Sequence, residues 1–130
     1  MADDLCEKFG RFVVRTITAS NYELRYCGGH VVAMQFIPAH SVIGEIHGTP
    51  TYIDEADSNA RLMYVSGDCV LEVADVADNM LGMCRMGTCE DDANATIMPD
   101  EYQRCFLMAY RDIQPFQKII YVPMDLVMGD

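Results

Sequence analysis

The sequence predicts a single, mostly β domain, and three observations lead to this prediction. The chain has 130 residues, and a chain close to about 150 residues is usually one domain. Short runs rich in Val, Ile, Thr and aromatic residues recur along it and are separated by turn residues, which is typical of strands. No repeat, low-complexity tract or linker divides the chain. Many short strands with few helices favour a β-rich α+β domain around one core.

The expected strands run from near the N-terminus to the end of the chain. They are residues 12–18, 21–26, 30–36, 41–46, 49–53, 62–65, 69–73, 95–98, 104–110 and 118–122. Turns are expected around Pro38, at residues 99–101 and at residues 112–116, because Pro and acidic residues interrupt the apolar runs there.

Two segments are expected to be helical, residues 1–10 and residues 75–86. The second has apolar residues at helical spacing behind Asp75 and Asp78, either of which could cap its start. Residues 89–92 (CEDD) are expected to form an acidic loop.

The charge balance excludes several function classes. Nine Lys and Arg against 20 Asp and Glu give a net charge of −11, and the basic residues are scattered singly. Direct binding to nucleic acid or to an anionic membrane is therefore not expected, because both need clustered bases. A basic partner, such as a lysine-rich tail, is compatible with this charge. The N-terminus has acids where a signal peptide would have bases, so an intracellular protein is expected.

The six cysteines do not indicate a metal site. None belongs to a CxxC pair, and the three histidines lie far from any paired cysteines, so no zinc site is expected. Reduced, mostly buried thiols fit an intracellular chain. We expect the ten methionines to fill gaps in the core.

General catalytic motifs are absent from the sequence, which has no GxSxG, P-loop, HExxH or dinucleotide fingerprint. Three segments do resemble a known family when taken together and in order. They are residues 28–48 (GGHVVAMQFIPAHSVIGEIHG), residues 85–95 (RMGTCEDDANA) and residues 108–122 (MAYRDIQPFQKIIYV). They resemble, respectively, the Gly-rich opening strands, the "RFINHSCxPNA" segment and the "RDIxxGEELTYDY" segment of the SET domains of protein-lysine methyltransferases. The resemblance covers roughly residues 12–123.

This resemblance implies a SET-like fold of several small sheets, with few short helices and a threaded C-terminal crossing. Residues 12–130 would form this domain, and residues 1–11 would form an N-terminal extension that could be helical. The family binds S-adenosylmethionine, and the positions that match its pocket are Gly28, His30, Arg85, Thr88 and Cys89. Tyr121 matches the first tyrosine of "YDY" and would be catalytic only if the domain is active.

The departures from the family pattern fall on residues that the chemistry uses directly. His30 stands at the second glycine of the Gly-rich turn, where a side chain adds bulk and removes backbone freedom. Thr88-Cys89 replaces an Asn-His pair and cannot reproduce the paired donor and acceptor of an amide. The Gly-Asn ahead of the motif becomes Leu81-Gly82, and Pro123 falls where the family has its second tyrosine. No flanking zinc-binding cysteine cluster occurs in the sequence.

These departures favour a non-catalytic SET-like domain that serves as a protein-interaction or scaffolding module in chromatin regulation. No cofactor or metal is expected, and the partners would be proteins, including a basic histone-like tail received by acidic residues 54–57 or 90–92. A nuclear location follows only from the resemblance. Two alternatives stay open. One is an active, divergent lysine methyltransferase that retains S-adenosylmethionine and uses Tyr121 to orient the amine. The other is an unrelated small β-rich interaction domain.

Overall fold

The structure is a computed structural model that describes residues 22–76 and 79–128. The strand expected at residues 12–18, the helix expected at residues 1–10 and the boundary of the extension lie outside the described residues. No helix in the described part is long and apolar enough to span a membrane.

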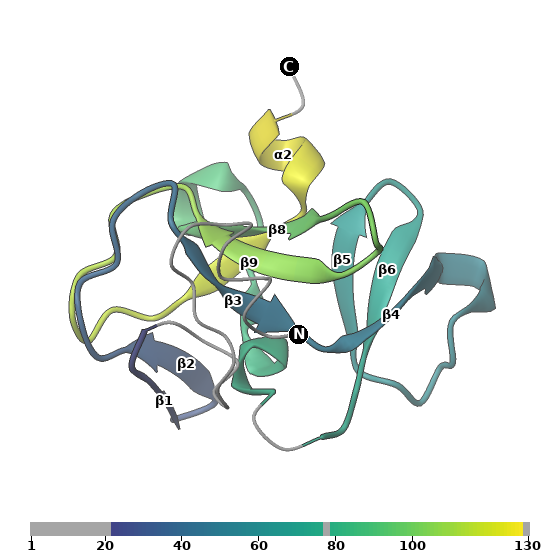
Figure 1. Ribbon diagram of the computed structural model, residues 1–130, viewed down its shortest axis with the longest axis horizontal. Coiled ribbons are helices and arrows are strands. Elements are labelled where there is room, and N and C mark those ends of the chain that lie inside the picture. Colours follow the sequence, from purple (N-terminus) through teal and green to yellow (C-terminus); the bar gives the residue numbers. More distant parts are fainter. Residues whose placement is uncertain (1–21, 77–78, 129–130) are drawn as a thin grey trace.

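Three small sheets make up the fold (Figure 1). A hairpin of β1 (Leu24–Cys27) and β2 (His30–Ala33) lies at one end of the molecule, at the left of the view. At the other end, β4 (Gly48–Tyr52), β6 (Cys69–Val73) and β5 (Leu62–Ser66) form an antiparallel sheet in that order.

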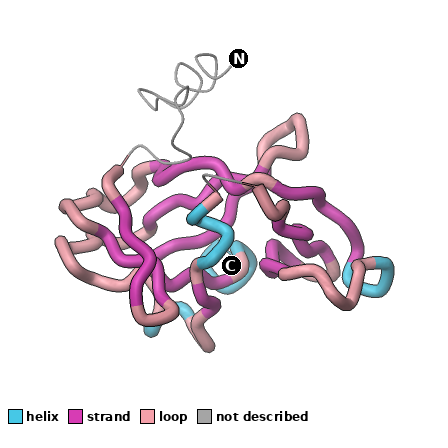
Figure 2. Tube along the Cα trace, turned by 90° about the horizontal axis from the view of Figure 1, so that it is seen from below, coloured by secondary structure: helices cyan, strands magenta, loops and turns pink. Residues whose placement is uncertain are grey.

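The central sheet has five strands in the order β3-β9-β8-β10-β7. They are β3 (Val42–Ile46), β9 (Cys105–Ala109), β8 (Ala95–Pro99), β10 (Ile120–Val122) and β7 (Arg85–Met86). Within residues 22–76 and 79–128, helical structure is limited to single turns between strands, as Figure 2 shows, and to the helix after β10. These pieces are η1 (Ile53–Glu55), η2 (Met80–Met83), η3 (Glu90–Asp92) and α2 (Met124–Met128). The predicted β-rich architecture of several small sheets is confirmed.

One hydrophobic core joins the three sheets. Its fully buried side chains come from the hairpin, from the central sheet and from the β4-β6-β5 sheet, and include Val31, Ile43, Ile97, Leu107 and Leu71. Alternation of buried and partly buried residues along β5 explains why the sequence pattern locates this strand closely. Of the methionines, Met63 is buried, Met80, Met83 and Met124 pack partly against the core, and Met86 is 48% exposed.

The helix expected over residues 75–86 is wrong, since only the short η2 forms there among the described residues. Tertiary hydrogen bonds to the Asn79 side chain override the helical spacing. Its Nδ2 donates to the carbonyls of His47 and Ala74, at 3.0 and 2.7 Å, and its Oδ1 accepts the His47 N–H. The acidic segment 89–92 contains η3 rather than an irregular loop, and α2 was not predicted.

The C-terminal strand produces the crossing that the resemblance implied. β10 lies between β7 and β8 and is parallel to both. Because β7 and β8 are consecutive in the chain, their connection, residues 87–94, must pass across β10. A connection that crosses a strand lying between the two strands it joins is rare among protein topologies.

Asn94 fixes this crossing. Its backbone N–H donates to Ile120 O at 2.9 Å, its Nδ2 donates to Lys118 O at 2.9 Å, and its Oδ1 accepts the Ile120 N–H at 3.0 Å. The residue is only 6% exposed, so water cannot replace these partners.

We expect Asn94→Ala to lower the free energy of unfolding by about 2 kcal/mol, because it leaves the Lys118 carbonyl and the Ile120 N–H, two part-buried groups, without their side-chain partner. Urea denaturation followed by circular dichroism measures this loss. Asn59→Ala, at an exposed position, is the control and should change stability little. Equal stability of the two variants would contradict the role given to Asn94.

Candidate functional site

The turn between β1 and β2 brings three of the predicted site residues together. Gly28 and Gly29 adopt φ of 62° and 79°, a region that favours glycine. The Arg85 Nε donates to Gly29 O at 2.7 Å. A Cβ at Gly29 would lie 2.9 Å from a terminal nitrogen of Arg85, so the guanidinium is packed directly against this turn. Gly28, His30 and Arg85 therefore form one cluster.

His30 lies between two cations. Desolvation is the largest cause of a lowered pKa at His30, followed by the positive charges of Lys118 and Arg85. Its Nδ1 is buried and has no hydrogen-bond partner among the described residues. A buried nitrogen without a partner is uncommon and calls for an explanation.

Thr88 and Cys89 lie in the connection that crosses β10, and their polar groups are bonded locally. The Asp92 carboxylate accepts the Thr88 hydroxyl at 2.7 Å, the Thr88 N–H at 3.1 Å and the Cys89 N–H at 3.1 Å. These hydrogen bonds lower the pKa of Asp92, the Thr88 hydroxyl bond most of all. A turn whose polar groups are bonded to Asp92 thus occupies the positions that match the Asn-His pair of the SET family.

Tyr121 is not part of this cluster. Successive residues of a strand face opposite sides, so Tyr121 points away from the side that Ile120 shares with its register partner Arg85. The ring is 2% exposed, and its hydroxyl accepts the Tyr64 N–H at 3.0 Å. Burial raises the pKa of Tyr121 to about 12. Tyr121 is therefore a core residue with a bonded hydroxyl.

Arg61 places a permanent positive charge near this hydroxyl. Its Nε donates to Gly82 O at 2.5 Å and its Nη2 to Cys84 O at 3.4 Å. The charge acts on both Tyr121 and Cys84, which shows that it lies close to each. Backbone carbonyls beside Tyr121 are thus already occupied by a cation from the chain itself.

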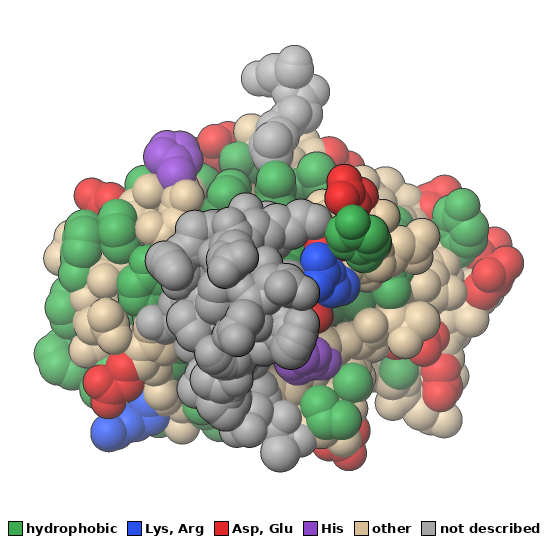
Figure 3. Space-filling model, viewed as in Figure 1, with side chains coloured by type: hydrophobic (Ala, Val, Ile, Leu, Met, Phe, Trp, Pro, Cys, Tyr) green, Lys and Arg blue, Asp and Glu red, His purple; other side chains and the backbone are tan. Residues whose placement is uncertain are grey.

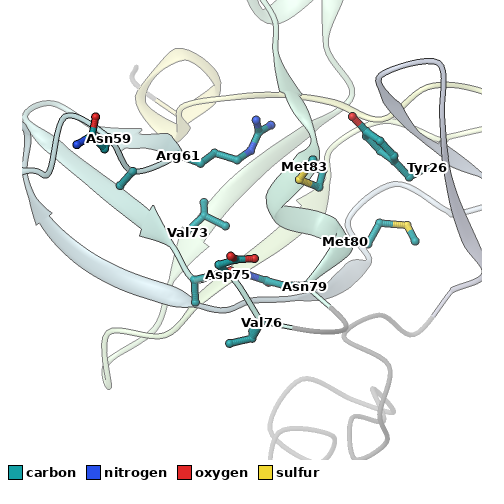
Figure 4. A pocket seen from close by; sticks show the side chains of 11 residues that line it. Tyr26, Asn59, Arg61, Val73, Asp75, Val76, Asn79, Met80 and Met83 are labelled. Carbon is teal, nitrogen blue, oxygen red and sulfur yellow. Dashed lines mark hydrogen bonds between the residues drawn. The ribbon is translucent and has the colours of Figure 1, made fainter.

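A pocket of about 640 Å³ opens beside Arg61, between η2, the end of β6 and β1 (Figure 4). In Figure 4, Tyr26 and Arg61 point toward Met83 from opposite sides. Val73, Met80 and Met83 give the pocket apolar walls. The exposed Asp75 carboxylate also lines it and has no hydrogen bond or ion pair with any described residue. Such a pocket is suited to a side chain with an aliphatic stem and a cationic head.

Sequence reasoning missed the residues of this pocket. Arg61, Asp75 and Tyr26 are isolated in sequence, and only the packing of the β4-β6-β5 sheet against η2 brings them together. The sequence pattern predicts that Asp75 caps a helix, whereas in the structure Asp75 lines the pocket.

Solved structures similar to this chain are SET-domain proteins. The methyltransferase domain of human PR domain-containing protein 2 superposes with a TM-score of 0.57 at 13% identity, over 82% of this chain and 78% of that one. KRYPTONITE, in complex with mCHG DNA and SAH, superposes with a TM-score of 0.55 at 19% identity, over 83% of this chain. The ATXR5 SET domain, in complex with histone H3 di-methylated on R26, superposes with a TM-score of 0.56 at 19% identity, over 78% of this chain.

The chain therefore has a SET-like fold. It spans 24% of the KRYPTONITE chain and 56% of the ATXR5 chain. No protein-family model and no curated protein matches the sequence.

The residues at the matching positions do not fit S-adenosylmethionine. The Thr88 and Cys89 N–H groups are bonded to Asp92, and Arg85 occupies the space beside Gly29.

We expect Tyr121→Phe to fold normally and to lose about 1–2 kcal/mol of stability, because the Tyr64 N–H loses its acceptor. Urea denaturation at neutral pH measures the loss. A stability equal to wild type would show that the hydroxyl bond contributes nothing.

The raised pKa values also predict alkaline sensitivity. The folded chain holds the protons of Tyr121, Cys84 and Cys105 up to about pH 12, compared with ordinary pKa values of 10.0 for tyrosine and 9.0 for cysteine. Stability from these groups is therefore fully present below about pH 9 and is lost as the pH rises toward 12. Unfolding midpoints in urea should fall over this range, and less steeply in Tyr121→Phe. Identical slopes for both proteins would contradict the assignment to Tyr121.

Proposed function

We propose that this SET-like domain is a non-catalytic interaction module of a chromatin protein, acting in the nucleus, that binds a basic peptide segment in the pocket beside Asp75. The observation that carries the proposal is the burial of Tyr121 together with the hydrogen bond that its hydroxyl accepts. Its hydroxyl is buried and bonded to Tyr64, and the guanidinium of Arg61 stands beside it.

Methyl transfer needs an amine brought in line with the methyl donor in a prepared site. Here a reacting amine would have to reach a hydroxyl that is 2% exposed. The poor fit of Gly29, Arg85, Thr88 and Cys89 to the cofactor supports the same conclusion.

The charge of the chain supports a basic ligand. The net charge is −11, and acidic side chains are spread over the face shown in Figure 3, where basic ones are few. A negative surface attracts a basic segment and speeds its association. In the pocket, Met80, Met83 and Val73 would contact the aliphatic stem of a lysine or arginine. Asp75 would pair with its charge, and Tyr26 could add a cation–π contact.

Solved structures similar to this chain contain the same class of ligand. ATXR5 is described in complex with histone H3, and KRYPTONITE with an H3(1-15) peptide. A histone-like tail is therefore the first peptide to test on this chain.

We expect no methyl transfer to the H3(1-15) peptide or to whole histones, measured with radiolabelled S-adenosylmethionine. An active SET enzyme assayed in parallel verifies the reagents. Transfer above the protein-free background would overturn the non-catalytic assignment and favour the active-enzyme alternative.

We expect the H3(1-15) peptide to bind, and Asp75→Asn to weaken binding by about five- to tenfold, because the ligand cation loses its partner. Isothermal titration calorimetry at low salt measures both affinities. Asp68→Asn is the matched control, since it removes one exposed acid at the other end of β6. Equal weakening in the two variants would mean that general charge, and not the pocket, binds the peptide. Absence of any binding would overturn the proposal for this ligand.

A further inference from the structure

Basic side chains gather on one face of the strands around the β1–β2 turn. Arg25 is directly opposite Val32, and Val32 is bridged to Lys118. Directly opposite residues of a sheet share a face, as do residues two apart along a strand. Arg25, His30 and Lys118 therefore lie on one face.

The same face continues to β7. Ile120 is two residues beyond Lys118 and is the register partner of Arg85. The electrostatic influence of both Lys118 and Arg85 on His30 agrees with this placement. We call Arg25, His30, Arg85 and Lys118 the basic face.

Arg25, Arg85 and Lys118 have no acidic partners in the described part of the chain, whereas two other arginines do. Arg104 is paired with Asp100 at 2.7 Å, and Arg111 lies 3.7 Å from Asp91. Among the described residues, Arg85 is hydrogen-bonded only through its Nε to Gly29 O, which leaves its terminal nitrogens for a ligand. In a chain with a net charge of −11, a group of cations without carboxylates needs an explanation.

Two of these cations, Lys118 and Arg85, lie near the same residue, His30. Lys118 and Arg85 both act on the imidazole of His30, and its Nδ1 is buried without a partner among the described residues. A compact dianion with several acceptor oxygens matches such a cluster better than carboxylates spaced along a peptide. A phosphoryl group has this charge and three strong acceptors, and a guanidinium binds it through paired donors.

We propose that the basic face binds the phosphoryl group of a phosphomonoester ligand, at a site separate from the Asp75 pocket. Arg85 would hold two phosphate oxygens through its terminal nitrogens, and Lys118 would provide the second charge.

Calorimetry with the whole chain at about pH 7.5, where a phosphomonoester is mostly dianionic, tests the proposal. The first probe is inorganic phosphate, with sulfate at equal ionic strength for comparison. We expect Arg85→Gln and Lys118→Gln each to weaken phosphate binding by roughly tenfold. Arg104→Gln is the control. It removes the same charge from the turn before β9, at the other end of the central sheet from β1 and β2 (Figure 1). Circular dichroism checks that every variant is folded.

Two further probes distinguish the source of the phosphoryl group. O-phosphoserine that binds more tightly than adenosine monophosphate would indicate a phosphorylated protein, and the reverse order would indicate a nucleotide. Equal binding would mean that the phosphoryl group alone is recognised. No binding of phosphate by the wild type, or equal weakening in Arg85→Gln and Arg104→Gln, would overturn the proposal. The Asp75→Asn variant should bind phosphate like the wild type, so this test is independent of the peptide site.

Discussion

The hydrogen bonds between Asn94 and the segment entering β10 are the interaction on which the rest of the structure depends. The backbone and side chain of Asn94 bind Lys118 and Ile120 from one buried position. They hold a three-residue strand between two parallel neighbours that are themselves short. A strand of this length has too few ladder bonds to hold its register alone, so the side chain of one asparagine sets which residues of β10 face each side.

The basic face and the burial of Tyr121 depend on that register. Tyr121 faces the β4-β6-β5 side, where its hydroxyl accepts the Tyr64 N–H and Arg61 lies nearby. Lys118 and Ile120 face the opposite side, next to His30 and Arg85. A shift of one residue would exchange these faces. A SET-like fold can thus retain its shape while one side is closed by core packing and the other presents charge. This explains why most of the framework remains recognisable where the residues of the chemistry have changed.

The sequence predicted several strands well from short apolar runs bounded by turn residues. The predicted run of residues 69–73 coincides with β6, and the predicted turn at residues 99–101 lies at the hairpin of β8 and β9. The helix over 75–86 failed because Asn79 bonds to His47 and Ala74, contacts that no local spacing reveals. Among the site residues, the joining of Gly28, His30 and Arg85 followed from the family resemblance. Lys118, Arg61 and Asp75 could not be found in this way. Their roles arise from register across β2 and β10 and from packing of η2, which bring together residues that are far apart in sequence.

The central claim is that this fold binds a peptide without a working methyl-transfer site. Nuclear magnetic resonance of the isotopically labelled chain, titrated first with S-adenosylmethionine and then with the H3(1-15) peptide, tests it most directly. The account expects no shifts with the cofactor, and shifts with the peptide at Tyr26, Asp75 and Met83. Cofactor-induced shifts at Gly28, Thr88 and Tyr121 would contradict it, because they would show a pocket that accepts the methyl donor and reaches the tyrosine.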